Sequence, residues 1–278
     1  MKEIFDKLSA QCSEMITKRY STSFSLGIYF LNEKFRGPIY SIYGFVRLAD
    51  EIADSFHDYN KVVLLSKFKR DCFEAIKDGI SLNPVLNAFQ QVVNTYHIEK
   101  ELIELFLQSM EMDLNYEHYT AEKYNQYILG SAQVVGLMCL YVFTEGDKLQ
   151  YEKLKYSAMK LGSAFQKVNF LRDLNADYYT LSRTYFPNVN LSEFSNIEKK
   201  IIEEEIEAEF QLALIGIREL PPSSRNGVYL AYFYYKKLFN KIKKSTVEKV
   251  MSGRIRISNV RKFGLMFDSI IRYKTNTI

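Results

Sequence analysis

Two groups of polar side chains stand at helical spacing in this sequence, and their residue types could bind a cation together. The first group lies in and beside the segment GFVRLADEIADSF, with spacings of 4, 3 and 4 residues: Tyr43, Arg47, Asp50 and Asp54. The second group has spacings of 3, 4 and 4 residues: Gln166, Asn169, Asp173 and Asp177. Because residues three or four apart share one face of an α-helix, each group predicts a continuous polar stripe on a largely apolar helix.

The four aspartates are the electrostatically unfavourable part of these stripes. Carboxylates that face one cavity repel each other and raise their own pKa values unless cations are present. One pair of aspartates a turn apart is weak support for a metal site, because the solvated faces of ordinary helices carry many such pairs. Two pairs on apolar helices, each beside Arg, Tyr or amide groups, favour a shared cation site.

The donor set favours Mg²⁺. Carboxylate oxygens without Cys or His partners suit Mg²⁺ better than zinc or copper. None of the three histidines lies in the Glu-x-x-His arrangement of a di-iron helical bundle. Mg²⁺ held by few carboxylates keeps water and binds the phosphates of a substrate. The sequence shows no Walker loop, dinucleotide fingerprint or kinase signature that would make this substrate a nucleotide.

Aromatic residues indicate what the phosphate is attached to. The 278 residues include 21 Tyr and 20 Phe but no Trp. Most of these rings are expected to fill the core, yet enough remain to line an apolar cavity. A diphosphate on an apolar chain, inside a bundle rich in rings, is the chemistry of isoprenoid diphosphates. Metal ions there neutralise the leaving group, and ring faces stabilise an allylic cation.

The elements that position the stripes are predicted to be helices throughout. Apolar residues recur at i, i+3 and i+4 in ELIELFLQSMEMDL and in NIEKKIIEEEIEAEFQLALIGI, whereas alternating strand patterns are missing. Prolines are expected near helix ends: Pro38, Pro84, Pro187, Pro221 and Pro222. Without linkers or repeats, residues 1–278 are predicted to form one all-α domain of about eight to ten helices.

The cellular location expected from the sequence is the cytoplasm. The first residues, MKEIFDKLSAQC, lack the apolar stretch of a signal peptide. The longest apolar run, VVGLMCLYVF, is too short to span a bilayer. Three scattered cysteines favour a reducing compartment and no disulfide framework.

Positive charge is concentrated in residues 225–278, called here the basic C-terminal segment. It carries 13 Lys and Arg against two acidic residues, or +11, which leaves about −7 for the rest of a chain of net charge +4. Such a segment could meet nucleic acid, anionic lipid or a phosphorylated substrate, and a merely solvated face is an equal alternative. No nucleic-acid-binding module is recognisable. We therefore expect no nucleic-acid partner, and at most peripheral contact with the inner membrane face.

Four segments also match the pattern of a known family: YSTSFSLGIYFL, PIYSIYGFVRLADEIAD, YILGSAQVVGLM and LGSAFQKVNFLRDLNADYYTLSRTYFP. Through them the chain resembles the squalene and phytoene synthase family, the head-to-head prenyl synthases, over most of its length. The resemblance implies a helical bundle of the isoprenoid-synthase type around a central cavity. Glu51 is a departure, because many members carry a second Asp there, but the longer carboxylate can still contribute.

The resemblance implies a role for each residue at a matching position. Residues implied to bind Mg²⁺, with Mn²⁺ as the alternative, are Asp50, Asp54, Asn169, Asp173 and Asp177. Residues implied to bind substrate are Ser21, Ser23, Phe24, Arg47, Gln166, Arg172 and Arg183. Tyrosines implied to line the reaction chamber are Tyr43, Tyr127, Tyr185 and Tyr235, with Tyr234 as an alternative to the last.

Several of these residues have a simpler interpretation. Ser21 and Ser23 precede an apolar run and could cap a helix. Tyr127 and Tyr235 could be ordinary core residues, and Arg183 could pair with a surface carboxylate.

The family's reaction has two steps. One prenyl diphosphate ionises, and its cation attacks the double bond of a second, giving a cyclopropyl intermediate that keeps one diphosphate. That diphosphate then ionises, the skeleton rearranges, and a proton is lost or a hydride is added from NADPH. NADPH is not expected here, because no dinucleotide fingerprint is evident.

The length of the substrate is predicted from residues that keep the pocket deep. Ile28, two turns beyond Ser21, is smaller than Phe, and Gly130, Gly136 and Gly162 keep their helices thin. Together with the resemblance of the chain to the bacterial phytoene synthases of the family, these features favour two geranylgeranyl diphosphates and the product phytoene. Two farnesyl chains, giving dehydrosqualene or squalene, remain the alternative, and a non-catalytic scaffold on the same fold is a more distant one.

Overall fold

Helices form every regular element in the described part of the chain, which confirms the predicted all-α class. The computed structural model describes residues 1–114, 119–181, 185–187, 189 and 194–257, with the backbone alone at 176–181. The first helices are α1 (Lys2–Tyr20), α2 (Thr22–Tyr29), α3 (Glu33–Asp54), α4 (Lys61–Asp78), α5 (Pro84–Tyr96) and α6 (Lys100–Leu114). The remaining ones are α7 (Ala121–Ile128), the π-helical turn η1 (Leu129–Gln133), α8 (Val134–Thr144), α9 (Lys148–Leu181), α10 (Asn196–Glu219), α11 (Pro222–Lys243) and α12 (Val247–Met251).

These twelve α-helices of the described residues exceed the eight to ten expected, because three of them are short. The helices α2 and α7 have 8 residues each, and α12 has 5. Short helices carry too few turns for their periodicity to stand out in a sequence.

The helix ends follow local capping chemistry. Asn60 opens α4 by accepting a hydrogen bond from the Val63 N–H at 3.1 Å, and Gly79 closes it with a φ of 72°. Pro84 opens α5 in the first turn, as expected. Pro38 instead lies inside α3, in its second turn, so the prediction that it marks a helix end was wrong. A proline this early removes only one intrahelical hydrogen bond, which the helix tolerates.

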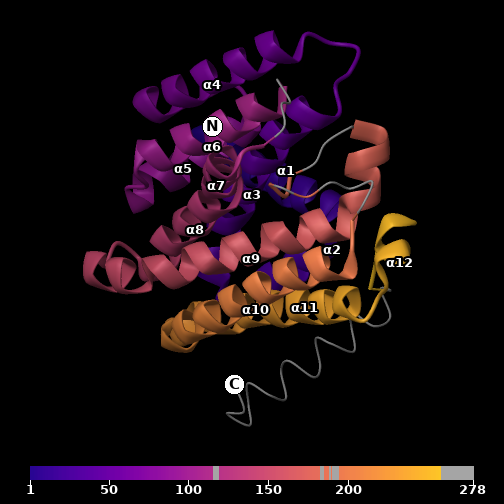
Figure 1. Cartoon of the computed structure of the whole chain (residues 1–278). Coiled ribbons are helices and arrows are strands. Elements are labelled where there is room, and N and C mark those ends of the chain that lie inside the picture. Colours follow the sequence, from indigo (N-terminus) through magenta and orange to yellow (C-terminus); the bar gives the residue numbers. More distant parts are fainter. Residues whose placement is uncertain (115–118, 182–184, 188, 190–193, 258–278) are drawn as a thin grey trace.

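Two apolar cores make up the interior. One joins α3, α4, α5, α6 and α8 around the fully buried rings of Phe35, Phe45 and Phe89. The other joins α7, α9, α10 and α11 around Phe210 and Phe239. Figure 1 shows α9, α10 and α11 as neighbouring rods at one side, with α4, α5 and α6 grouped at the other.

A buried charged cluster fixes α9 against α10. The Lys167 ammonium lies 2.9 Å from Glu209 Oε1, and the two side chains are only 4% and 6% exposed. The same oxygen accepts a hydrogen bond from Ser163 Oγ at 2.8 Å. A buried ion pair of this kind resists separation because removing one partner would leave the other charge uncompensated. The rotation of α9 about its axis is therefore well defined.

One helical stretch of the described residues, Ala121–Thr144, is long and apolar enough to cross a membrane. It comprises α7, η1 and α8, and most of its apolar window is buried inside the protein, as is usual for a core helix. Within it, Gly130 lies so close to α6 that a Cβ atom there would come 2.4 Å from the Leu105 carbonyl oxygen. A glycine is therefore required at this crossing.

Candidate active site

A cavity of about 300 Å³ lies where the two cores meet. Its walls come from α2, α3, η1, α8, α9, α10 and α11. From α9 the lining runs from Leu154 to Asn169, which is roughly 22 Å at 1.5 Å per residue. From α3 it runs from Ile39 to Val46. The cavity is therefore a long apolar channel parallel to part of α9.

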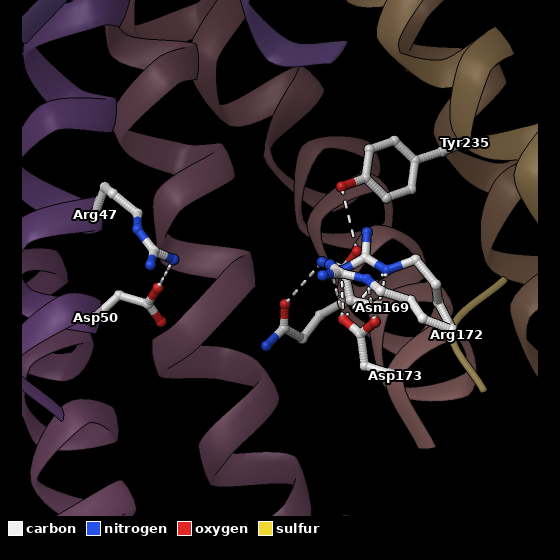
Figure 2. A network of polar contacts seen from close by, with 8 residues as sticks. Arg47, Asp50, Asn169, Arg172, Asp173 and Tyr235 are labelled. Atoms are coloured by element: carbon white, nitrogen blue, oxygen red, sulfur yellow. Dashed lines mark hydrogen bonds and ion pairs between the residues drawn. The ribbon is translucent and has the colours of Figure 1, made fainter. Parts of the chain in front are cut away.

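Both predicted stripes begin at this channel. Tyr43 of α3 and Gln166 and Asn169 of α9 line the cavity. The carboxylates follow in the next turns of the same helices, at Asp50 and Asp173. Figure 2 shows Arg47 and Asp50 on one side, and Asn169, Arg172 and Asp173 on the other. The channel thus leads from an apolar interior to a charged region built by α3 and α9.

Aromatic rings surround the channel next to this charged region. The Phe24 ring centroid lies 5.6 Å from that of Tyr43 and 5.8 Å from that of Tyr235. Phe165 stacks on Tyr235 at 3.9 Å. These ring faces can stabilise a carbocation that forms beside them.

Tyr235 links this ring cluster to the second stripe. Its hydroxyl donates a hydrogen bond to Asn169 Oδ1 at 3.3 Å, and the Asn169 amide donates to Gln166 Oε1 at 3.4 Å. Burial raises the pKa of Tyr235 to about 12, so the hydroxyl stays protonated and acts as a donor at neutral pH.

Arg47 joins the acidic side chains of the first stripe. Its guanidinium binds Asp50 through one nitrogen and Glu51 through another, and it lies 4.3 Å from the centroid of the Tyr20 ring. Burial of Glu51 raises its pKa, but hydrogen bonds with Ser55, Arg47 and Tyr20 outweigh burial and hold the pKa below its ordinary value. The carboxylate that departs from the family pattern is therefore ionised and takes part in the network.

Asp173 of the second stripe is held by two guanidinium groups. Arg172 Nε lies 3.0 Å from Oδ1 and 3.1 Å from Oδ2. Arg254, far along the chain, places Nε 2.7 Å from Oδ1 and one terminal nitrogen 3.3 Å from Oδ2. Burial lowers the pKa of Arg172, but its hydrogen bonds and charge interaction with Asp173 raise it overall. Arg172 is therefore charged.

The donor chemistry of this region fits a hard divalent cation. The described acidic side chains could supply oxygen ligands from two helices, and Asn169 of α9 could add an amide oxygen. Among side chains that the structure describes, no three His, Cys, Asp or Glu residues are grouped tightly enough to hold a metal ion by themselves. In this structure the arginines neutralise the negative charge of the carboxylates. A bound cation would take over part of that neutralisation.

Comparison with known proteins identifies the family to which this chain belongs. Residues 17–261 match the squalene/phytoene synthase family. The chain belongs to this family. The prediction from the four segments is confirmed.

The curated relatives that this chain matches include both a diapophytoene synthase and phytoene synthases. A 4,4'-diapophytoene synthase of Staphylococcus haemolyticus is 29% identical over 192 residues, covering 66% of this chain and 64% of that protein. Phytoene synthase 1 of Solanum lycopersicum is 23% identical, covering 87% and 62%. The phytoene synthase of Arthrospira platensis is 24% identical, covering 85% and 84%. The chain thus spans a little under two thirds of the length of the first curated relatives it matches.

Solved structures share the fold. A dehydrosqualene synthase in complex with a ligand superposes with a TM-score of 0.85 at 21% identity, covering 97% of this chain and 98% of that one. A squalene synthase of Alicyclobacillus acidocaldarius gives a TM-score of 0.74 at 19% identity, covering 87% and 95%. The predicted isoprenoid-synthase-type bundle around a cavity is confirmed.

Three predicted chamber tyrosines lie outside the cavity lining, namely Tyr127, Tyr185 and Tyr235, although Tyr235 stacks on the lining residue Phe165. Tyr127 and Tyr185 are buried in the second core, where the Tyr185 ring stacks on Phe170 at 4.1 Å. The Tyr127 hydroxyl donates a hydrogen bond to Asp113 at 2.9 Å, and burial raises the pKa of Tyr127 well above its ordinary value. Their placement agrees with the simpler interpretation of Tyr127 as a core residue, and their predicted contact with substrate stays a prediction.

The remaining predicted residues lie at a helix cap, within a helix, or wholly or partly outside the described residues. Ser21 caps α2 by accepting a hydrogen bond from the Phe24 N–H at 3.2 Å, so the capping alternative applies to it. Ser23 is half-buried within α2, and Asp54 is half-buried in the last turn of α3. The backbone of Asp177 lies in α9, but its side chain, like Arg183 as a whole, is outside the described residues.

Sequence reasoning missed two residues that the structure brings to these networks. Asp113 falls on the buried face of α6, 6% exposed, one turn after Met110 and two after Phe106. A carboxylate at an apolar position was the signal that could have found it. Arg254 had no local signal, because its link to Asp173 joins positions 81 residues apart.

Proposed function

We propose that the protein is a Mg²⁺-dependent prenyltransferase that joins two geranylgeranyl diphosphates head to head to give phytoene. The observation that carries this proposal is the apolar channel between α3 and α9, whose wall residues Tyr43 and Asn169 stand two turns and one turn before Asp50 and Asp173 on the same helices. Family membership supports the reaction class. A substrate with an apolar tail and a diphosphate head matches both parts of the site.

The chain's own residues bind and orient the diphosphate. Arg47 and Arg172 carry planar guanidinium groups suited to paired hydrogen bonds with phosphate oxygens. The oxygen donors of both stripes would hold a divalent cation, which would further neutralise the leaving diphosphate. The buried hydroxyl of Tyr235 and the amide of Asn169 fix the edge of the channel where the tail begins.

Aromatic and apolar walls then control the cation formed when diphosphate leaves. The C–O bond breaks with its electron pair going to diphosphate, which leaves an allylic cation near Phe24, Tyr43 and Phe165. This cation is attacked by the double bond of the second substrate, and loss of a proton closes the cyclopropyl ring. Departure of the second diphosphate, rearrangement and loss of another proton give the hydrocarbon. Apolar walls exclude the water that would otherwise capture either cation.

Ile28 supports the choice of the longer substrate. It is 4% exposed and lines the channel, where a side chain smaller than Phe leaves depth for a longer tail. Gly136 and Gly162 also line it, and a Cβ on Gly162 would come 2.5 Å from the Ala132 carbonyl oxygen. A Cβ on Gly136 would likewise come 2.9 Å from the Ala158 carbonyl oxygen, so these glycines let η1 and α8 approach α9.

A second candidate is the condensation of two farnesyl diphosphates. The bulky residues Leu31, Phe143 and Leu154 also line the channel and would limit its depth. Similarity to the 4,4'-diapophytoene synthase of Staphylococcus haemolyticus is compatible with a shorter substrate. Both candidates use the same site, and they differ in the length of tail accommodated.

The deciding experiment incubates the purified protein with Mg²⁺ and either geranylgeranyl or farnesyl diphosphate, with and without NADPH. Products are separated by chromatography and identified by mass. We expect phytoene from geranylgeranyl diphosphate and no change of product with NADPH. A faster reaction with farnesyl diphosphate would overturn the substrate, and a hydrocarbon formed only with NADPH would overturn proton loss. No turnover of either would favour a non-catalytic scaffold.

We further infer a cytoplasmic location with weak contact at the inner membrane face. The hydrocarbon product is insoluble in water, and the basic C-terminal segment would be attracted to anionic lipid. Fractionation of cells at low and high salt tests this inference, because a protein held only by charge is released from membranes by salt.

A further inference from the structure

The chain that follows α12 crosses the C-terminal part of α9. We call residues 251–257 the C-terminal strap. Asn175 of α9 donates a hydrogen bond to the Met251 carbonyl oxygen, and Lys241 of α11 donates to the Arg256 carbonyl oxygen at 2.6 Å. Ile255 and Ile257 are buried, at 5% and 8% exposure. The strap is therefore docked on the helices by both polar and apolar contacts.

Arg254 of the strap reaches the second aspartate stripe. Its Nε lies 2.7 Å from Asp173 Oδ1, and a terminal nitrogen lies 3.3 Å from Oδ2. Arg172 binds the same two oxygens. A carboxylate has about four lone-pair sites, and these two guanidinium groups occupy them. A divalent cation can therefore bind Asp173 only if one arginine withdraws.

The two arginines differ in how easily they can withdraw. The Arg172 side chain is 20% exposed and neighbours Asp173 on the same rigid helix. The Arg254 side chain is 46% exposed and stands on a short non-helical segment. An exposed ion pair contributes little free energy, so the contact of Arg254 is the weaker of the two.

We propose that Arg254 and the divalent cation compete for Asp173. The ion pair between Arg254 and Asp173 is formed before the cation binds and breaks when the cation binds. This inference rests on the metal site of the proposed function. It makes Arg254 a positioning residue, which holds Asp173 at a defined rotamer in the empty site and delays loading of the cation. The strap thereby couples the C-terminal part of the chain to occupancy of the active site.

The first test measures cation binding directly, without turnover. Free Mn²⁺ is counted by electron paramagnetic resonance in titrations of the full chain without diphosphate. The proteins are the wild type, Arg254→Gln and Arg256→Gln, the last being a control that removes the same charge from the same strap. We expect Arg254→Gln to bind Mn²⁺ about two- to fivefold more tightly, the range of an exposed ion pair. The control should match the wild type within about a factor of 1.5.

The second test asks whether cation and Arg254 exclude each other. Thermal unfolding of the same proteins is followed in EDTA and in saturating Mg²⁺. We expect Arg254→Gln to melt below the wild type in EDTA, and this difference to shrink in Mg²⁺, because the loaded wild type has already lost the contact. Arg256→Gln should show the same difference from the wild type in both conditions.

The outcomes separate this inference from the proposed function. Wild-type binding of Mn²⁺ with unchanged or weaker binding by Arg254→Gln would refute competition and leave the metal site standing. A melting difference that is equal in EDTA and Mg²⁺ would also refute it, since the contact would then persist in the loaded protein. Absence of Mn²⁺ binding by the wild type would remove both the metal site and this inference.

Discussion

The substitution Ile28→Phe tests the depth of the channel. Ile28 is 4% exposed and lines the channel from α2, so a larger side chain there must project into space that a prenyl tail would fill. Phe has three more side-chain carbons than Ile. Displacing about three methylene groups at about 0.8 kcal/mol each removes roughly 2.4 kcal/mol from binding of the longer tail, or about fiftyfold in affinity.

The assay is the ratio of kcat/KM for geranylgeranyl and farnesyl diphosphate, compared between variant and wild type. We expect Ile28→Phe to shift this ratio towards farnesyl diphosphate by about ten- to fiftyfold, allowing for relaxation of the wall. Ile28→Val removes one methyl group and should shift it slightly the other way. As a control, Ile76→Phe overpacks α4 at a core site outside the channel lining and should lower stability while leaving the ratio unchanged. A ratio unchanged in Ile28→Phe would show that the tail does not pass this residue.

Four further experiments probe other parts of the molecule. Asp50→Ala should lower turnover by at least about a hundredfold with an unchanged far-ultraviolet circular dichroism spectrum, because a cation ligand is lost but no core contact is; near-normal activity would refute its role as a metal ligand. Glu51 has a lower pKa in the folded protein than in the unfolded one, so its carboxylate stabilises the fold above about pH 4.3 and this contribution is lost as the pH falls through the lowered value. The urea midpoints of wild type and Glu51→Gln should therefore differ at neutral pH and converge below about pH 4, and a constant difference would contradict the argument. Lys167→Met should cost about 3 kcal/mol in urea unfolding because it leaves the buried Glu209 with only the more distant Lys160 ammonium at 3.4 Å, whereas Lys160→Met, at a 26% exposed position, should cost less than about 1 kcal/mol. Co-sedimentation of the protein with anionic liposomes should fall between low and high salt, and sedimentation that does not depend on salt would argue that the basic C-terminal segment serves another purpose.

The spacing of residues in the sequence correctly predicted which side chains share one face of a helix. The stripes that begin at Tyr43 and Gln166 lie on α3 and α9, and both reach the channel, because the 3.6-residue period fixes which side chains share a face. The same period placed Ile28 of α2 on the wall of the channel. These successes need no knowledge of how the helices pack.

Side-chain contacts between different helices were harder to predict. Tyr127 lies in a motif that matches the family, yet its ring packs in the second core and its hydroxyl binds Asp113 on α6. Arg254 meets Asp173 only because the chain turns back after α12. Such contacts depend on the packing of segments far apart in sequence, and residue types alone do not specify it.

The π-helical turn η1 gives the cavity wall a place where the number of residues can change without rotating the helix that follows. Residues Ser131 and Ala132 of η1 line the channel, and α8 continues the same rod with Val135, Gly136 and Cys139 on the wall. A π-turn holds one residue more than an α-turn, and each residue rotates a helix by about 100°. Loss of a single residue between 129 and 133 would therefore convert the π-turn into an α-turn and leave the wall residues of α8 facing the channel. Loss of a single residue inside α8 has no such compensation and would turn the rest of that helix by more than a quarter of a revolution. Over evolutionary time, η1 is thus the place on this rod where one residue can be gained or lost without redrawing the channel wall.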